Sequence, residues 1–276
     1  MNTSDFFEHI VVKGMNADIH LIAKGDKNGI PIIFLPGITS YSHSFIKILG
    51  LMPDKFYSLS MDIRGRGLSD APKTGYLLED YTEDLLNVIN ALIANPQSPV
   101  LVGHSMGARL SAQFGSRYGA LISGMVLIDP PVNGPGQRSV YPNAMSMFIK
   151  QKEAVDQGEL DLFRSLLPPS FTEEQVAERA EEYRNVNLYA FIESYHSLLR
   201  EPFQVYVKML TVPTLLLAAE HGDTIREDEL QVLKTINPRM QVEKVKDVAH
   251  MIYKDAPEQT ADYIVSFIEK LTNQSN

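Results

Sequence analysis

Short apolar segments rich in β-branched residues alternate along most of this chain with longer segments whose apolar residues recur at helical spacing. This alternation is typical of an α/β fold, in which parallel strands are joined by crossover helices that cover both faces of one sheet. A strand from about Ile10 has the position of an antiparallel edge strand. The other strand-like segments are residues 17–23, 30–35, 56–61, 100–102, 124–128, 214–218 and 240–245.

The alternation stops after Asp129, and residues 141–210 carry only helical patterns. Prolines punctuate these patterns, and the strand pattern resumes after Pro213. We interpret this stretch as a helical cap inserted after the sixth strand. The predicted domains are a core of residues 1–135 and 211–276 and a helical cap of residues 136–210.

Size and composition are those of one large globular core with an insertion. The chain has 276 residues, of which 44% are hydrophobic and 21% charged. Its net charge of −9 disfavours a surface that binds nucleic acid. The absence of cysteine excludes a disulfide framework, a thiolate zinc site and a cysteine nucleophile. Because we find no membrane-spanning run and no secretion signal, we expect a cytoplasmic protein without a membrane partner.

The strongest chemical motif is the sequence Gly-His-Ser-Met-Gly at residues 103–107, which lies between an apolar strand-like segment and a helical one. In this context the motif is typical of a nucleophile elbow, a strand-to-helix turn so tight that a side chain at position 103 or 107 would clash. Such a turn holds the serine hydroxyl above the sheet. Ser105 is therefore the predicted nucleophile.

A serine hydroxyl attacks at neutral pH only when a histidine takes its proton and a carboxylate orients that histidine. His250 fits the role of base, because it follows the last strand-like segment and preserves the chain order of serine, acid and histidine. The other histidines have structural explanations. His9 and His20 lie in the predicted first hairpin, His196 lies in the cap, and His104 is expected to point away across the turn.

Two aspartates at strand ends are candidates for the acid. Asp129 directly follows segment 124–128, and Asp223 lies in the loop after segment 214–218. Each also has a structural explanation, since Asp129 is a turn residue before a proline and Asp223 is a potential helix N-cap. Spacing alone leaves the choice open.

An oxyanion intermediate needs two backbone N–H donors, one from the residue after the nucleophile and one from a loop after an earlier strand. These are Met106 and Ile38. The glycines of residues 62–69 also follow a strand, but a dinucleotide loop would need a third glycine where Asp70 stands. No Walker motif and no His-Glu-x-x-His motif occurs, so we predict neither a cofactor nor a metal.

Substrate-binding residues are harder to predict. Arg109, just past the elbow, and Arg138 are candidates for a bidentate clamp on a substrate carboxylate, although each is equally well explained as a structural arginine. His43 is a candidate pocket-lining residue. The expected partner is a small molecule, such as an amide that carries a carboxylate.

Together these motifs resemble the α/β-hydrolase superfamily from about Ile30 to the end, which implies the α/β-hydrolase fold with a mostly parallel sheet of eight strands, as many as the strand-like segments found here. Within it, the N-formylmaleamate deformylases are similar at residues 35–40, 62–69, 103–109, 129–132, 134–136, 141–142 and 249–252. The resemblance implies cofactor-independent hydrolysis of a formamide with release of formate. It favours Asp129 as the acid, whereas Asp223 has the position more usual in the superfamily.

The residues support one main function and two alternatives. The main one is hydrolysis of a small amide or formamide by a Ser-His-Asp triad through an acyl-enzyme. The first alternative is a carboxylesterase or a hydrolase of a carbon–carbon bond in a small organic acid, since the fold and the triad do not separate these reactions. The second, which an intact triad disfavours, is a non-catalytic protein that binds a ligand in the same pocket.

Overall fold

Eight strands form one sheet in the computed structural model, which describes residues 7–93, 97–133 and 145–274. The first two pairings in the order β1-β2-β4-β3-β5-β6-β7-β8 are antiparallel and the others are parallel. This confirms the predicted mostly parallel sheet. The strands are β1 (Glu8–Val12), β2 (Ile19–Gly25), β3 (Ile30–Leu35), β4 (Phe56–Met61), β5 (Val100–His104), β6 (Gly124–Ile128), β7 (Thr214–Ala219) and β8 (Gln241–Val245).

The central strands β3 to β6 are buried at nearly every position because helices cover both faces of the sheet. In β3, Ile33 and Leu35 belong to one hydrophobic core, and Ile32 and Phe34 belong to the core on the opposite face. The first core includes residues of α2 (Leu78–Leu92), α3 (Met106–Tyr118), α8 (Phe203–Met209) and α9 (Glu227–Ile236). The second includes residues of α1 (Ile46–Leu51), α10 (Ile252–Asp255) and α11 (Pro257–Gln274).

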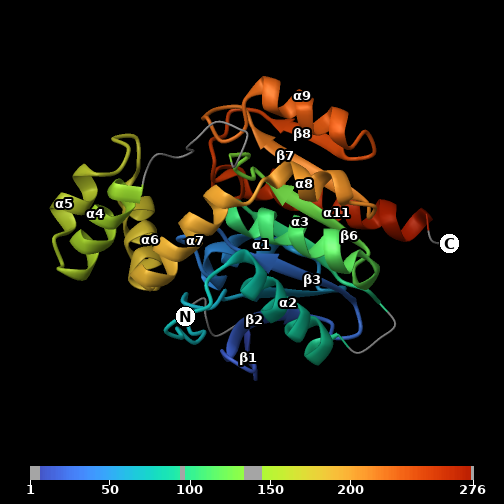
Figure 1. Cartoon of the computed structure of the whole chain (residues 1–276), viewed down its shortest axis with the longest axis horizontal. Helices are drawn as coiled ribbons and strands as arrows, with labels where there is room; N and C mark the ends of the chain where they lie inside the picture. The colour runs from blue at the N-terminus through green and yellow to red at the C-terminus, as the bar shows by residue number, and fades with distance from the viewer. Residues whose placement is uncertain (1–6, 94–96, 134–144, 275–276) are drawn as a thin grey trace.

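From Met145 to β7, the described residues are mostly helical, in agreement with the predicted helical insertion. Figure 1 shows α4, α5 and α6 on one side of the molecule, joined to the core through α7. These helices are α4 (Met145–Asp156), α5 (Leu160–Ser165), α6 (Glu173–Arg184) and α7 (Leu188–Arg200). The last helix of the stretch, α8, lies on the core, since Phe203 and Val207 pack with the first hydrophobic core.

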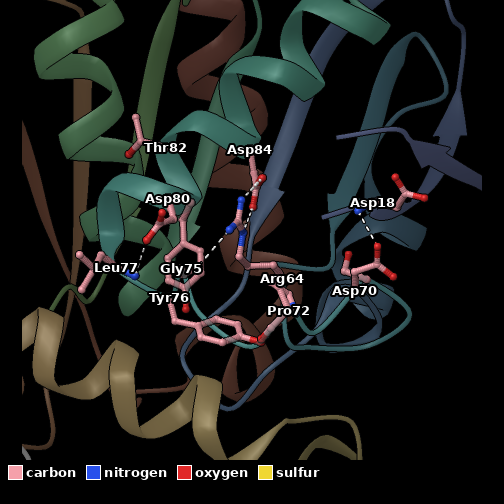
Figure 2. A network of polar contacts seen from close by, with 12 residues as sticks. Asp18, Arg64, Asp70, Pro72, Gly75, Tyr76, Leu77, Asp80, Thr82 and Asp84 are labelled. Carbon is pink, nitrogen blue, oxygen red and sulfur yellow. Dashed lines mark hydrogen bonds and ion pairs between the residues drawn. The ribbon is translucent and has the colours of Figure 1, made fainter. Parts of the chain in front are cut away.

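The chain between β4 and α2 is fastened by polar contacts (Figure 2). Arg64 donates to both carboxylate oxygens of Asp84 at 2.6 Å and to the carbonyl of Gly75 at 3.0 Å. Asp70 accepts the backbone N–H of Asp18 at 2.9 Å. Both contacts join segments that are distant in the sequence, so they fix the loop that follows β4. No helix in the described residues is long and apolar enough to span a membrane.

Candidate active site

Ser105 stands at the turn between β5 and α3 with strained backbone angles, φ 54° and ψ −114°. A Cβ atom on Gly103 would lie 2.2 Å from the carbonyl oxygen of Gly107, and one on Gly107 would lie 1.9 Å from that of Leu35. Glycine is therefore required at both positions. The turn places the serine at the N-terminus of α3, where the first N–H groups, including that of Met106, have no partner within the helix.

His250 lies beside Asp129, with its Nδ1 atom 2.7 Å from Asp129 Oδ2. The aspartate follows β6 with a positive φ of 45°, is buried, and also accepts the backbone N–H of Ala219 at 3.1 Å. That second bond fixes the carboxylate at the end of β7. With Nδ1 directed at Asp129, the imidazole offers Nε2 to the cavity.

The other candidate acid, Asp223, lies on the surface, in the loop that follows β7. The carboxylate of Asp223 forms a bidentate ion pair with Arg226, at 2.6 and 3.0 Å, on the surface. Its neighbour Thr224, which the sequence did not single out, is buried and places its hydroxyl 3.1 Å from His250 Nδ1. The loop after β7 thus reaches the histidine through a threonine.

A cavity of about 420 Å³ lies between the core and the cap. Ser105 and His250 both line it, as does Ile38 from the loop after β3. The cap contributes much of the remaining wall, and its apolar contributions include Phe148, Leu167, Phe171, Tyr195, Leu198 and Leu199. The predicted nucleophile, base and one oxyanion donor thus face one enclosed space.

The model of the alpha/beta hydrolase fold family matches residues 30–257. The chain belongs to this family. It is 28% identical over 234 residues to N-formylmaleamate deformylase from Pseudomonas putida, a match that covers 84% of this chain and 86% of the relative. It is also 28% identical to 2-(acetamidomethylene)succinate hydrolase from Mesorhizobium japonicum, with 88% and 89% covered.

Solved structures agree with these relatives. The N-formylmaleamic acid deformylase of Pseudomonas putida superposes with a TM-score of 0.82 at 26% identity, over 91% of this chain and 97% of the other. With the named hydrolases among its relatives, this alpha/beta hydrolase is a hydrolytic enzyme. The strand order and the elbow described above are therefore those of a hydrolase.

In this alpha/beta hydrolase, the expectation for His104 needs correction. The residue does not point away from the site: it lines the cavity, its ring centroid lies 4.6 Å from that of His250, and its Nε2 lies 2.9 Å from the backbone oxygen of His250. Because a carbonyl oxygen only accepts, Nε2 carries the proton. Burial, reinforced by the His250 ring, lowers the pKa of His104 well below its ordinary value, so the ring stays neutral and holds the His250 loop.

Arg109 is likewise not placed to bind substrate. Its guanidinium is fully buried and donates to the backbone carbonyls of Pro131 and Asn133, both at 2.9 Å, and to that of Glu201. Burial lowers the pKa of Arg109 to about 10. The side chain points from α3 toward the segment after Asp129, which it ties to the end of α7.

The remaining two substrate-binding candidates do not form part of the described cavity wall. His43 is half-buried and stacks on Tyr41, with ring centroids 5.2 Å apart, and it is not among the described residues that line the cavity. Burial lowers the pKa of His43. Arg138 lies outside the described residues.

Three cationic residues that the sequence did not single out lie at the site. Arg66 is buried and donates twice to the carbonyl of Ile38, at 3.2 Å each, and to Ser194 of α7 at 2.9 Å, so it braces the loop that carries the predicted oxyanion donor. Arg179 of α6 and Lys254 of α10 both line the cavity. The sequence carries no signal for Arg179 and Lys254, because only the docking of the cap on the core brings them together.

Proposed function

We propose that this enzyme is a serine hydrolase of small amides, with formamides as the favoured class. Ser105 acts as the nucleophile, His250 as the base and Asp129 as the acid that orients it. The observation that carries the proposal is the placement of His250 between a buried carboxylate, 2.7 Å from Nδ1, and a cavity that Ser105 also lines. The bond to Asp129 fixes the tautomer that leaves Nε2 free to accept a proton.

In the first half of the reaction, the Ser105 hydroxyl oxygen attacks the amide carbonyl carbon and its proton passes to His250 Nε2. The N–H groups of Ile38 and Met106 stabilise the negative charge that develops on the carbonyl oxygen. The carbon–nitrogen bond then breaks as His250 returns the proton to the departing nitrogen. The products of this half are a free amine or amide and an ester on Ser105.

In the second half, water attacks the ester carbon and gives its proton to His250. The bond between the acyl carbon and the serine oxygen breaks, and Ser105 recovers the proton from His250. A formyl ester releases formate, and a longer acyl group releases its carboxylic acid. The Asp129 carboxylate stabilises the imidazolium that forms in each half.

Two relatives whose names describe amide-cleaving enzymes support the choice of amides, since both align over more than four fifths of the chain, at 84% and 88%. One is named as a deformylase and the other as a hydrolase of a compound with an acetamido group, so the acyl group in each name is small. A large apolar acyl chain would have to fill the cavity beside the charged Arg179 and Lys254.

Purified enzyme is assayed against matched formamides, acetamides and esters, with formate or acetate quantified directly. We expect formamides or acetamides to turn over and Ser105→Ala to abolish the release. Rapid turnover of esters together with inert amides would favour the carboxylesterase alternative. Ligand binding without any turnover would favour the non-catalytic one.

A further inference from the structure

Two cations in the cavity wall share one buried carboxylate. Glu182 of α6 accepts a hydrogen bond from Arg179 Nη1 at 2.6 Å and forms an ion pair with Lys254, whose Nζ lies 2.9 Å from its carboxylate. It also accepts the hydroxyl of Ser44 at 2.5 Å, and its side chain is only 3% exposed. Glu182 is not among the cavity-lining residues, whereas both cations are. The two cationic residues therefore line the cavity, whereas the residue that carries their shared counter-charge does not.

The charges of this cluster do not cancel. Arg179, Lys254 and Glu182 together keep one positive charge. Burial alone would raise the pKa of Glu182, but Arg179, Lys254 and the bond from Ser44 outweigh it and lower the pKa, so the carboxyl is ionised at neutral pH. The guanidinium stays charged too, because Tyr183 and Glu182 outweigh the effect of burial and raise the pKa of Arg179.

Acidic residues nearby have partners of their own. Glu178 lines the cavity, but its carboxylate lies 3.1 Å from Lys47 and 3.6 Å from Lys254. Lys47 also pairs with the exposed Glu174 at 3.8 Å. Asp255 is exposed and accepts the backbone N–H of Ala249 at 3.0 Å. Asp255 also lines the cavity, and Glu178 is shared between Lys47 and Lys254; among the described residues of the wall, Arg179 and Lys254 are the arginine and lysine side chains.

Both cations are tied to the segments that carry the proposed chemistry. Arg179 Nη2 donates to the hydroxyl of Thr39 at 2.8 Å, and Thr39 follows Ile38 directly. Lys254 lies in α10, the helix that begins just after His250. A group held by this pair would therefore lie in the same cavity as Ser105, next to the loop of the predicted oxyanion donor.

We propose that Arg179 and Lys254 form an anion subsite that binds a carboxylate of the substrate and so selects small acidic molecules. The contacts described above occupy two of the five N–H groups of a guanidinium, which leaves donors for a planar carboxylate. An acidic protein with a net charge of −9 does not attract anions through its overall field, so local cations must hold the anion. This subsite adds a substrate class to the proposed function. Turnover of such a substrate rests on the proposed function, whereas binding at the subsite does not, because binding needs no catalysis.

The subsite is tested by binding to the Ser105→Ala variant, measured by calorimetry. Maleate is the charged probe, and its neutral diamide of the same skeleton is the control ligand. We expect maleate to bind about 10- to 100-fold more tightly than the diamide, because charge-assisted hydrogen bonds are worth that much when desolvated. In a variant that carries Arg179→Gln together with Ser105→Ala, we expect the preference for maleate over the diamide to disappear. Equal binding of the two ligands, or a preference that survives Arg179→Gln, overturns the subsite.

Two further variants keep the test decisive. Arg184→Gln is the matched control, since Arg184 lies on the same helix, is half-exposed and pairs with Glu181 at 2.8 Å away from the cavity wall. It should retain the preference for maleate. If Arg179→Gln does not fold because Glu182 loses a partner, the double variant Arg179→Gln/Glu182→Gln removes both charges. It should fold and lose the preference, whereas a retained preference overturns the subsite.

Turnover of the unmodified enzyme separates this inference from the proposed function. Formate release without any preference for acidic formamides would refute the subsite and leave the reaction standing. Binding of maleate that depends on Arg179, with no turnover of any amide, would refute the reaction and leave the subsite standing.

Discussion

Two histidine–aspartate pairs of equal length lie at different depths in this hydrolase. His250 Nδ1 and His20 Nδ1 are each 2.7 Å from a carboxylate oxygen, of Asp129 and Asp62 respectively. The side chain of His250 is 32% exposed and lines the cavity, whereas that of His20 is 4% exposed. The pair distance alone therefore does not distinguish a catalytic pair from a structural one.

The contacts around each pair make the distinction. The carboxylate of Asp62 also accepts the backbone N–H of Ser42 at 2.6 Å and of Leu68 at 2.9 Å, so it joins three separate segments. The second nitrogen of His20 lies 2.9 Å from His9. In the other pair, the histidine itself lines the cavity that Ser105 also lines. We expect loss of the His20–Asp62 pair to reduce stability and loss of the His250–Asp129 pair to reduce turnover.

The largest expected effect is that of Ser105→Ala, which removes the group that gives the His250–Asp129 pair its function. Turnover should fall about a million-fold, leaving only the contribution of the oxyanion hole and binding. Adding Asp129→Asn to Ser105→Ala should cost little more, because the members of a triad act as a unit. Single-turnover kinetics measure both. Additive losses would show that Asp129 acts independently of the serine.

Asp129→Asn by itself should reduce kcat about ten-thousand-fold, because an amide at this position favours the wrong imidazole tautomer. The matched control is Asp223→Asn, whose exposed carboxylate pairs with Arg226. It should leave kcat nearly unchanged. Steady-state assays of the two variants decide the identity of the acid, and a larger loss in Asp223→Asn would transfer the role to that residue.

Asp62→Asn should mainly affect folding. It removes a charged acceptor from three buried hydrogen bonds, which should lower the free energy of unfolding by about 2 to 4 kcal/mol. Denaturant titration measures this loss, and kcat below the unfolding transition should stay within about tenfold of the parent value. A stable Asp62→Asn enzyme with a collapsed kcat would contradict the division between the two pairs.

The sheet could be predicted well because parallel strands with two covered faces are buried along nearly their whole length and carry mostly apolar residues. Residues 30–35, 56–61 and 124–128 were predicted with the bounds that the structure shows for β3, β4 and β6. The helix Leu160–Ser165 was not predicted, since six residues are too few for a clear period, and its Leu160 and Leu162 are exposed.

Chain order narrows the candidate site, and side-chain direction decides the rest. The order of serine, acid and histidine is met by Asp129 and by Asp223 alike, and only the structure shows that Asp129 is the one beside His250. Arg109 is near the elbow in sequence, but the turn of α3 directs its side chain to backbone carbonyls after Asp129. Arg179 lies far from every motif, and only the docking of α6 on the core brings it to the cavity.

The smallest expected effect is that of Thr224, whose hydroxyl is a second polar group beside His250 Nδ1, at 3.1 Å, where Asp129 lies at 2.7 Å. In the buried His20–Asp62 pair, the Nε2 atom of His20 instead lies within hydrogen-bond distance of the His9 ring. Thr224→Val keeps the shape and removes the hydroxyl, so kcat should fall about 3- to 10-fold, as for one neutral hydrogen bond. Thr224→Ser should restore most of the rate. If the hydroxyl only fills space, the valine and serine variants should have the same kcat. Equal kcat values for the two variants would therefore show that Thr224 does not orient the histidine.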